Sequence, residues 1–258
     1  MTAHTRRQLR VLGALVAVYS LLAAATYLIF PLDQLVPTQA LPIPELTIPG
    51  WQLALANAGI GVFLYGLLGL VGFWLARRLG LPGVFRPNGG WRWWLLFPML
   101  LGLGLGVAIE FADLLFATLQ DWPGFPQPPF PFSLVASVTA AIGEEVLFRS
   151  FVLGLWAFLL DLVLRRWINR RVVLWIGNLL AALAFAAGHL GSAMLLFGAT
   201  SPAEIPPLIL VEILLLNSAV GWVAGAQYIR QGLVAAIGVH FWADVALHIV
   251  RPLVELGH

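Results

Sequence analysis

The sequence predicts an all-α fold: a polytopic bundle of about seven to eight transmembrane helices with a polar cavity inside the membrane. Of the 258 residues, 60% are hydrophobic and only 10% are charged, whereas soluble domains carry roughly 25% charged residues. So few charges cannot cover a surface that faces water, but a surface that faces lipid needs none. Apolar runs of about 20 residues, the length that crosses a bilayer, recur along the whole chain. We therefore expect residues 1–258 to form a single integral membrane domain.

Seven apolar runs predict seven spans. The first is long and continues through TYLIF, so a retained span is favoured over a cleaved signal peptide. The fourth would be ~48 Å long if wholly helical, so it must tilt, protrude or break to fit a hydrocarbon core of ~30 Å. Alternatively, a re-entrant or broken segment in 189–206 would raise the number of spans to eight. The runs are 11–30, 51–76, 93–119, 133–164, 172–189, 207–228 and 233–250.

The arginines indicate the orientation of the bundle. All 14 residues counted as Lys or Arg are arginines, and they sit in alternate loops rather than on one basic face, which argues against a nucleic-acid partner. Arginine is present before the first run, in 77–92, in 165–171 and at Arg230, and absent from 31–50, 120–132 and 190–206. The positive-inside rule then predicts a multi-pass protein of the cell membrane with a cytoplasmic N-terminus. Arg251, after the seventh run, does not fit this alternation.

The stretch AIGEEVLFRS (141–150) places three charges in the middle of the fourth run. A charged side chain at the bilayer centre costs roughly 2.5–3.5 kcal/mol on insertion scales, so something must offset that cost. Glu145 and Arg149 are four residues apart and are predicted to pair on one helical face. Glu144 is turned about 100° away and has no partner at this spacing. It needs a polar cavity, a proton or a cation.

Further ionisable residues lie in two later runs. His189 ends the fifth run, and His240 and Asp244 share one helical face of the seventh. Carboxylates and imidazoles together suit the activation of water, either by a glutamate base or by a metal ion. Each residue also has a structural interpretation: an ion pair, a protonated buried carboxyl, an interfacial histidine or a hydrogen bond between helices. The chain has no cysteine, which excludes disulfides and cysteine nucleophiles.

The remaining polar and glycine-rich positions are expected to be structural. Glu110 and Asp113 either line the same cavity or pair with an arginine, and Asp161 is expected to pair with Arg165 at i,i+4. His248 is expected to lie too near a helix end to take part in the site. Interhelical hydrogen bonds are expected for Asn178, Glu212 and Asn217, helix packing for GLGLG (102–106), and an aromatic belt for Trp91, Trp93 and Trp94.

Three motifs in chain order resemble a known family. They are Glu144-Glu145-x-x-x-Arg149, Phe185-x-x-x-His189 and His240-x-x-x-Asp244, each within a different apolar run. The sequence is similar to the CPBP intramembrane proteases, which comprise the type II CAAX prenyl endopeptidases and the bacterial relatives called abortive-infection proteins. The similarity covers the core at about 133–250, and the first three runs match only as membrane helices.

The resemblance implies a role for each motif residue. Glu144 would activate water with help from His189, and His240 and Asp244 would stabilise the oxyanion. Glu145 and Arg149 would hold the architecture. The family is called a metalloprotease family, so a zinc ion held by Glu144, His189, His240 and Asp244 is one alternative and glutamate alone is the other. The third motif often ends in asparagine, so Asp244 would either bind a cation or, protonated, donate a hydrogen bond.

The function expected from these residues is an intramembrane endopeptidase that hydrolyses membrane-associated, prenylated or leader-type peptides. Two other classes stay open. An ion- or proton-coupled transporter needs similar intramembrane glutamate, histidine and aspartate, but usually shows paired inverted repeats, which the sequence lacks. A catalytically silent immunity or scaffold protein of the same fold is the third interpretation.

Overall fold

The computed structural model describes residues 1–30, 48–120, 125 and 127–250, and within them every regular element is helical. Residues 31–47 of the predicted outer loop 31–50, residues 121–124 and 126 of the loop 120–132, and Arg251 lie outside the described residues. The elements are α1 (Ala3–Ile29), α3 (Gly50–Ile60), η1 (Gly61–Tyr65), α4 (Gly66–Leu79), η2 (Arg92–Leu96), α5 (Phe97–Gln120), α6 (Phe132–Glu144), η3 (Glu145–Leu153), α7 (Gly154–Leu164), α8 (Arg170–Gly188), α9 (Leu190–Phe197), η4 (Pro202–Glu204), α10 (Pro207–Gln231), α11 (Leu233–Val245) and η5 (Ala246–Val250).

The predicted helix bundle is confirmed. Six described helical stretches are long and apolar enough to cross a membrane, and a seventh apolar helix, Leu233–His248, is shorter. All seven coincide with the apolar runs of the sequence to within a few residues, except that α1 begins earlier and includes the basic segment, and that the fifth span continues to Phe197. The segment after His189 is a break followed by α9, whose eight residues rise only ~12 Å. It extends the fifth span and is not an eighth.

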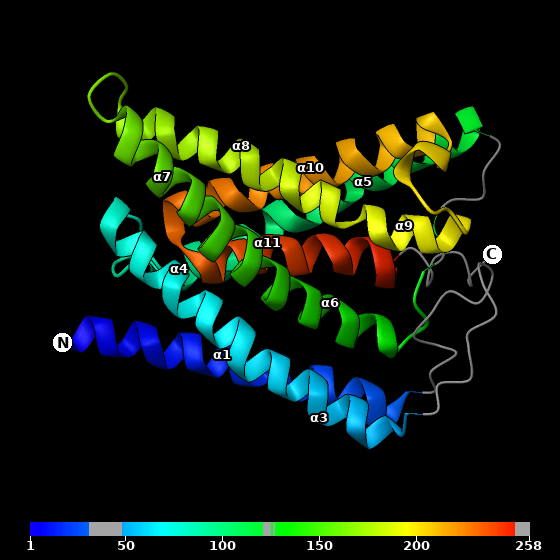
Figure 1. The fold of residues 1–258 in the computed structure, drawn as a ribbon, viewed down its shortest axis with the longest axis horizontal. Coiled ribbons are helices and arrows are strands. Elements are labelled where there is room, and N and C mark those ends of the chain that lie inside the picture. The colour runs from blue at the N-terminus through cyan, green and yellow to red at the C-terminus, as the bar shows by residue number, and fades with distance from the viewer. Residues whose placement is uncertain (31–47, 121–124, 126, 251–258) are drawn as a thin grey trace.

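The fourth span is one long helical stretch with a changed pitch at its centre. α6 passes into the π-helical segment η3 at Glu145 and returns to α-helix in α7 at Gly154. It tilts across the bundle from α6 to α7 (Figure 1). π-helical turns inside α-helices are frequent at functional sites, and this one coincides with the charged stretch.

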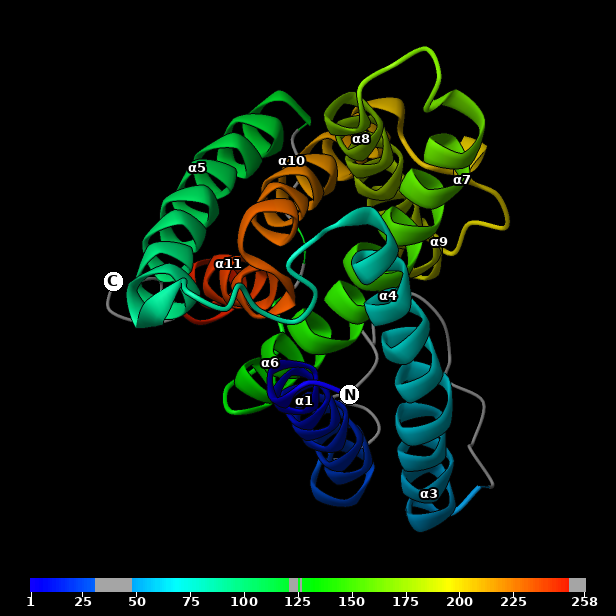
Figure 2. The ribbon, with the colours of Figure 1, turned by 90° about the vertical axis from the view of Figure 1, so that its left-hand side faces the viewer.

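α11 is the central helix of the bundle. It packs against α5, α10 and α6, and the end-on view shows it between these three (Figure 2). The contact with α5 is close because of two glycines of the GLGLG stretch: a Cβ at Gly102 would lie 2.5 Å from the carbonyl oxygen of Val239, and one at Gly106 would lie 2.6 Å from the Cβ of Ala246. The predicted helix-packing role of this stretch is confirmed.

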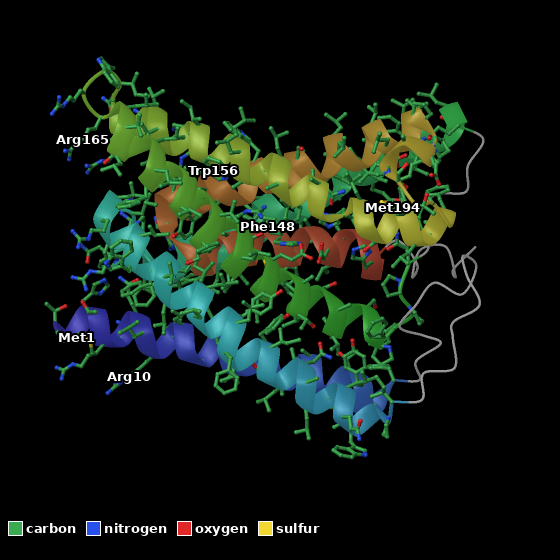
Figure 3. The ribbon with its side chains drawn as sticks, in the orientation of Figure 1. Met1, Arg10, Phe148, Trp156, Arg165 and Met194 are labelled. Atoms are coloured by element: carbon green, nitrogen blue, oxygen red, sulfur yellow. The ribbon has the colours of Figure 1, made fainter. Side chains whose placement is uncertain are left out.

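The arginine-bearing segments gather at one end of the bundle, which we call the basic end (residues 2–10, 77–92, 165–171 and Arg230). Met1, Arg10 and Arg165 lie at the same side in Figure 3, and Met194 of α9 lies at the other. Arg77, Arg86 and Arg230 line one surface hollow together with Thr2 and His4. The arginine-bearing segments therefore lie together at one end of the bundle, as their alternation in the sequence predicts. Which side of the membrane the basic end faces stays a prediction.

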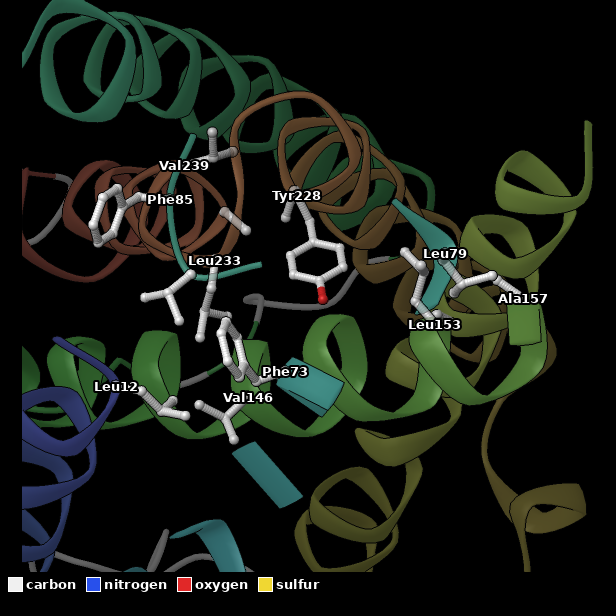
Figure 4. Close-up of a cluster of buried hydrophobic side chains, with 14 of the residues drawn as sticks. Leu12, Phe73, Leu79, Phe85, Val146, Leu153, Ala157, Tyr228, Leu233 and Val239 are labelled. Carbon is white, nitrogen blue, oxygen red and sulfur yellow. The ribbon is translucent and has the colours of Figure 1, made fainter. Parts of the chain in front are cut away.

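A packed apolar cluster fills the basic half of the bundle (Figure 4). Its fully buried members include Val146, Leu153, Tyr228 and Val239. The segment at 83–85 closes this cluster, because the backbone N–H groups of residues 233 and 234 donate to the carbonyls of residues 83 and 84 at 3.0 and 2.9 Å. The apolar cluster is thus closed toward the basic end by a hydrogen-bonded segment.

The orientation can be tested with single cysteines, since the natural chain has none to react. Asn88 is exposed at the basic end and Ala203 is exposed in the segment before α10. In intact cells a membrane-impermeant maleimide should label Ala203→Cys, and should label Asn88→Cys only after permeabilisation, because arginine-rich loops stay in the cytoplasm. The reverse pattern would place the N-terminus outside.

Candidate active site

The three motifs meet near the middle of the bundle. The first spans the junction of α6 and η3, the second ends α8, and the third lies on α11. α11 contacts both α6 and η3, and η3 contacts α8. Residues that are up to about a hundred positions apart in the chain therefore form one group.

Glu145 is the residue that joins the first and third motifs. Its Oε2 lies 3.0 Å from Arg149 Nε, and both side chains are 0% exposed. Its Oε1 accepts a hydrogen bond from His240 Nδ1 at 2.9 Å. The predicted Glu145–Arg149 pair is present. The bond to His240 was not predicted, because it joins two helices whose register against each other the sequence does not reveal.

The hydrogen bond to Glu145 determines which nitrogen of His240 remains available. With Nδ1 donating to Glu145, Nε2 lies 3.9 Å from Glu144 Oε2 and 3.6 Å from Asp244 Oδ1. Both distances exceed a direct hydrogen bond. A fixed imidazole with one nitrogen bonded to a carboxylate and the other facing reactive groups is a common arrangement in histidine chemistry.

The two adjacent glutamates have different surroundings. Glu145 is completely buried: its Oε1 is bonded to His240, and its Oε2 contacts Arg149 Nε as an ion pair without a hydrogen bond. The Glu144 side chain is 32% exposed, although its Oε2, 3.9 Å from His240 Nε2, is itself buried and has no hydrogen-bond partner among the described residues. The hypothesis that Glu144 needs a polar cavity, a proton or a cation stays a prediction.

Phe185 is the common contact of the buried site residues. The guanidinium carbon of Arg149 lies 4.4 Å from its ring centroid, and the rings of His189 and His240 lie 4.8 and 5.5 Å away. Arg149 Nη1 and Nη2 have no hydrogen-bond partner in the described part of the chain. The face of Phe185 therefore helps to accommodate the buried cation by a cation–π contact.

His189 lies at the break between α8 and α9. Its Nδ1 donates to the carbonyl of Phe185 at 2.9 Å, within the last turn of α8. Because Nδ1 is engaged with the backbone, Nε2 is left for other partners. The side chain is half-buried and lines a cavity, so the break in the helix exposes this histidine where a continuous helix would not.

A cavity of about 320 Å³ extends from these residues toward the end of the bundle that carries α9. His189, His240 and Asp244 line its inner part. Its walls are largely apolar, and its lining also includes Asp113, Gln127, Glu212 and His248. Neither Glu144 nor Glu145 is among the described lining residues; both lie next to His240, which separates Glu145 from the cavity.

Some expectations for the other polar residues need correction. His248 does line the cavity and hydrogen-bonds Gln127, although its position near the helix end suggested otherwise. Gln127 was missed, since nothing in a proline-rich loop marks one glutamine. Asp113 lines the cavity, which was one of the two positions expected for it. Glu212 accepts a hydrogen bond from Gln120 at 2.9 Å, which confirms the interhelical hydrogen bond expected for Glu212.

Of three further predicted contacts, two are wrong and one is confirmed. Asp161 pairs with Arg170 at 3.1 Å and not with Arg165, because α7 ends at Leu164 and the chain turns back so that the start of α8 lies beside it. Asn217 donates to the carbonyl of Ile213 in its own helix. Asn178 donates across helices to the carbonyl of Trp222, as predicted.

The residues proposed as zinc ligands do not form a metal-binding group as they are placed. Among the described side chains, no three or more His, Asp or Glu residues lie together closely enough to hold a metal ion. One nitrogen of His240 is already bonded to Glu145, and Asp244 and Glu144 lie 3.6 and 3.9 Å from the other. The zinc hypothesis stays a prediction.

Comparison with known proteins supports the resemblance carried by the motifs. Residues 126–246 match the family model described as Type II CAAX prenyl endopeptidase Rce1-like, and all three motifs lie inside the match. This match agrees with the resemblance recognised from the motifs. No curated protein and no solved structure matched the chain. The family indicates a CAAX-type protease of the membrane, in agreement with the multi-pass helical bundle.

Removing the Glu145 carboxylate tests its structural position. Glu145→Ala leaves Arg149 buried without its acidic partner, and breaking a buried pair from one side costs roughly 3–5 kcal/mol. We expect a large fall in the thermal unfolding temperature of the detergent-solubilised protein. The matched control is Asp161→Ala, which breaks a partly exposed pair worth about 0–1 kcal/mol. Equal shifts in the two variants would contradict the position given to Glu145.

Proposed function

We propose that the protein is an intramembrane endopeptidase in which Glu144 activates the water that hydrolyses the peptide bond. The observation that carries the proposal is the contrast between the adjacent glutamates. The Glu144 side chain is 32% exposed and lies beside His240, whereas the Glu145 side chain is completely buried between Arg149 and His240. A general base must reach its water, and of the two adjacent glutamates Glu144 is the one with exposed surface.

In the first step, Glu144 accepts a proton from water and the resulting hydroxide adds to the carbonyl carbon of the substrate. The carbonyl oxygen becomes a negatively charged oxyanion. A protonated His240 would present Nε2–H to this oxygen, since Nδ1 is bonded to Glu145. Asp244, when protonated, would donate a second hydrogen bond. Preorganised donors of this kind contribute much of the rate enhancement in acyl transfer.

In the second step, the carbon–nitrogen bond breaks and the leaving amine takes a proton. Glu144 returns the proton that it accepted, and the free Nε2 of His189 assists from the other side of the cavity. The products are a carboxylic acid and an amine, so one water molecule is consumed. Arg149 and Phe185 do not take part in proton transfer; they keep Glu145 and His240 in position.

The cavity supports a peptide substrate with apolar residues next to the cleaved bond. Its inner part is lined by polar groups of the motifs and its walls by aliphatic and aromatic side chains. Membrane-associated, prenylated or leader-type peptides offer such segments. The alternative of an ion-coupled transporter has no comparable support, because the segment that carries all the polar motif residues matches a protease family.

The first test of this mechanism is Glu144→Gln. The amide has nearly the same shape but cannot accept the proton, so turnover of a quenched fluorescent peptide should fall by at least ~100-fold. The unfolding temperature should stay close to that of the natural protein. Glu204→Gln, an exposed change outside the spans, is the control. Retained turnover in Glu144→Gln would reject Glu144 as the base.

Asp244→Asn separates the metal-free mechanism from the zinc alternative. Asparagine keeps a hydrogen-bond donor and removes the carboxylate, so a metal-free site should retain activity. If zinc is bound, the change removes a charged ligand and should weaken metal affinity. Activity of both forms is measured together with elemental analysis of the purified protein. Stoichiometric zinc that is lost together with activity in Asp244→Asn would favour the metal mechanism.

A further inference from the structure

We infer that the candidate active site takes its substrate from the end of the bundle opposite the basic loops. The arginine distribution predicts that this end faces away from the cytoplasm. The substrate class would then be apolar peptide segments presented at the outer face of the membrane, such as exported peptides or outer segments of membrane proteins. The inference rests on the proposed function for its substrate class, and on the packing of the bundle for its direction.

The position of the cavity along the helices gives the first argument. α8 starts at the basic end, and Phe185 lies ~22 Å along it at 1.5 Å per residue. From this level the cavity continues outward, past Ser192 and Leu196 of α9 and past Glu212, which is only ~8 Å from the far end of α10. None of the described lining residues belongs to 77–92, 165–171 or Arg230.

The packing on the other side of the site gives the second argument. Val146 directly follows Glu145, Val239 directly precedes His240, and both belong to the apolar cluster of the basic half. Leu153 and Tyr228 are also completely buried in it. Interiors packed to this degree leave no room for a peptide. Access from the basic end would require α4, η3, α10 and α11 to separate.

The basic end is also held shut by hydrogen bonds. The carbonyl oxygens of residues 83 and 84 accept hydrogen bonds from backbone N–H groups at the start of α11. The N–H of Val84 donates to Gln8 Oε1 of α1 at 2.7 Å. These bonds connect α1, the segment after α4 and the start of α11 across the face of the bundle.

The mouth of the cavity gives the third argument. The chain breaks at His189 and continues in α9, so that this short helix forms part of the wall. Ser192 is exposed, and Leu196, Leu216 and Asn217 are half-buried. The lining is therefore most accessible at α9, the end that Met194 marks in Figure 3.

Single-cysteine variants test the direction of access in two settings. In detergent, where both ends are accessible, a bulky sulfonated maleimide should remove most of the peptidase activity of Ser192→Cys and little from Asn88→Cys. In intact cells it should label and inhibit Ser192→Cys while leaving Asn88→Cys unlabelled. Leu195→Cys is the matched control on the same helix: Leu195 is exposed but does not line the cavity, so its labelling should not change activity.

An impermeant quenched peptide with apolar residues at its centre, added to intact cells, provides the direct readout. Cells with the natural protein should cleave it faster than cells with Glu144→Gln. Protection of Ser192→Cys until permeabilisation, with cleavage only in opened cells, would place the α9 end in the cytoplasm and overturn access from the outer face, while leaving the proposed function standing; inhibition through Asn88→Cys and not Ser192→Cys in detergent would overturn access from the α9 end. An absence of peptidase activity even in detergent would instead reject the proposed function, while the labelling pattern would still report the direction of the opening.

Discussion

The buried carboxylate of Glu145 is the interaction on which the rest of the site depends. It lies 3.0 Å from Arg149 on its own helical stretch and accepts a hydrogen bond from His240 of α11 at 2.9 Å. Each of these groups would be costly to bury alone. Together they offset one another, and the same contacts fix the ring of His240. The charge cluster therefore stabilises the crossing of two spans and also orients the group that faces Glu144.

Close backbone packing brings the partners of Glu145 within reach. Gly102 and Gly106 allow α5 to lie directly on α11, which holds the central helix in place. In lipid, helix association relies on such close van der Waals packing because apolar side chains gain nothing from leaving the bilayer. On the other side, the ring of Phe185 contacts Arg149, His189 and His240, so α8 is joined to the same centre. The geometry of the site thus follows from small residues on one helix and one aromatic residue on another.

The sequence predicted well what depends on composition and on spacing within one helix. Long apolar runs predicted the spans, and the i,i+4 spacing predicted the Glu145–Arg149 pair, because lipid imposes helices and helices impose that spacing. It could not predict contacts that depend on how two spans rotate against each other, such as Glu145 with His240. It was also wrong for Asp161, whose partner Arg170 lies beyond the turn that joins two spans. The sequence did not predict that His248 lines the cavity, because the distance of a residue from a helix end says little about whether its side chain faces a cavity.

A hydrolase within a bilayer must admit water and a polar peptide bond while keeping its own charges paired. The protein divides these demands along the axis of the bundle. In the basic half, an apolar cluster and a hydrogen-bonded cap exclude water around Val146 and Val239. In the other half, the cavity is lined by polar groups that can hydrogen-bond water, including Asp113, Gln127 and His248. His240 lies at the boundary, because its Nδ1 is bonded to the buried Glu145 and its ring lines the cavity. The adjacent glutamates differ in burial, with side chains 0% and 32% exposed, and the tasks proposed for them follow from that difference.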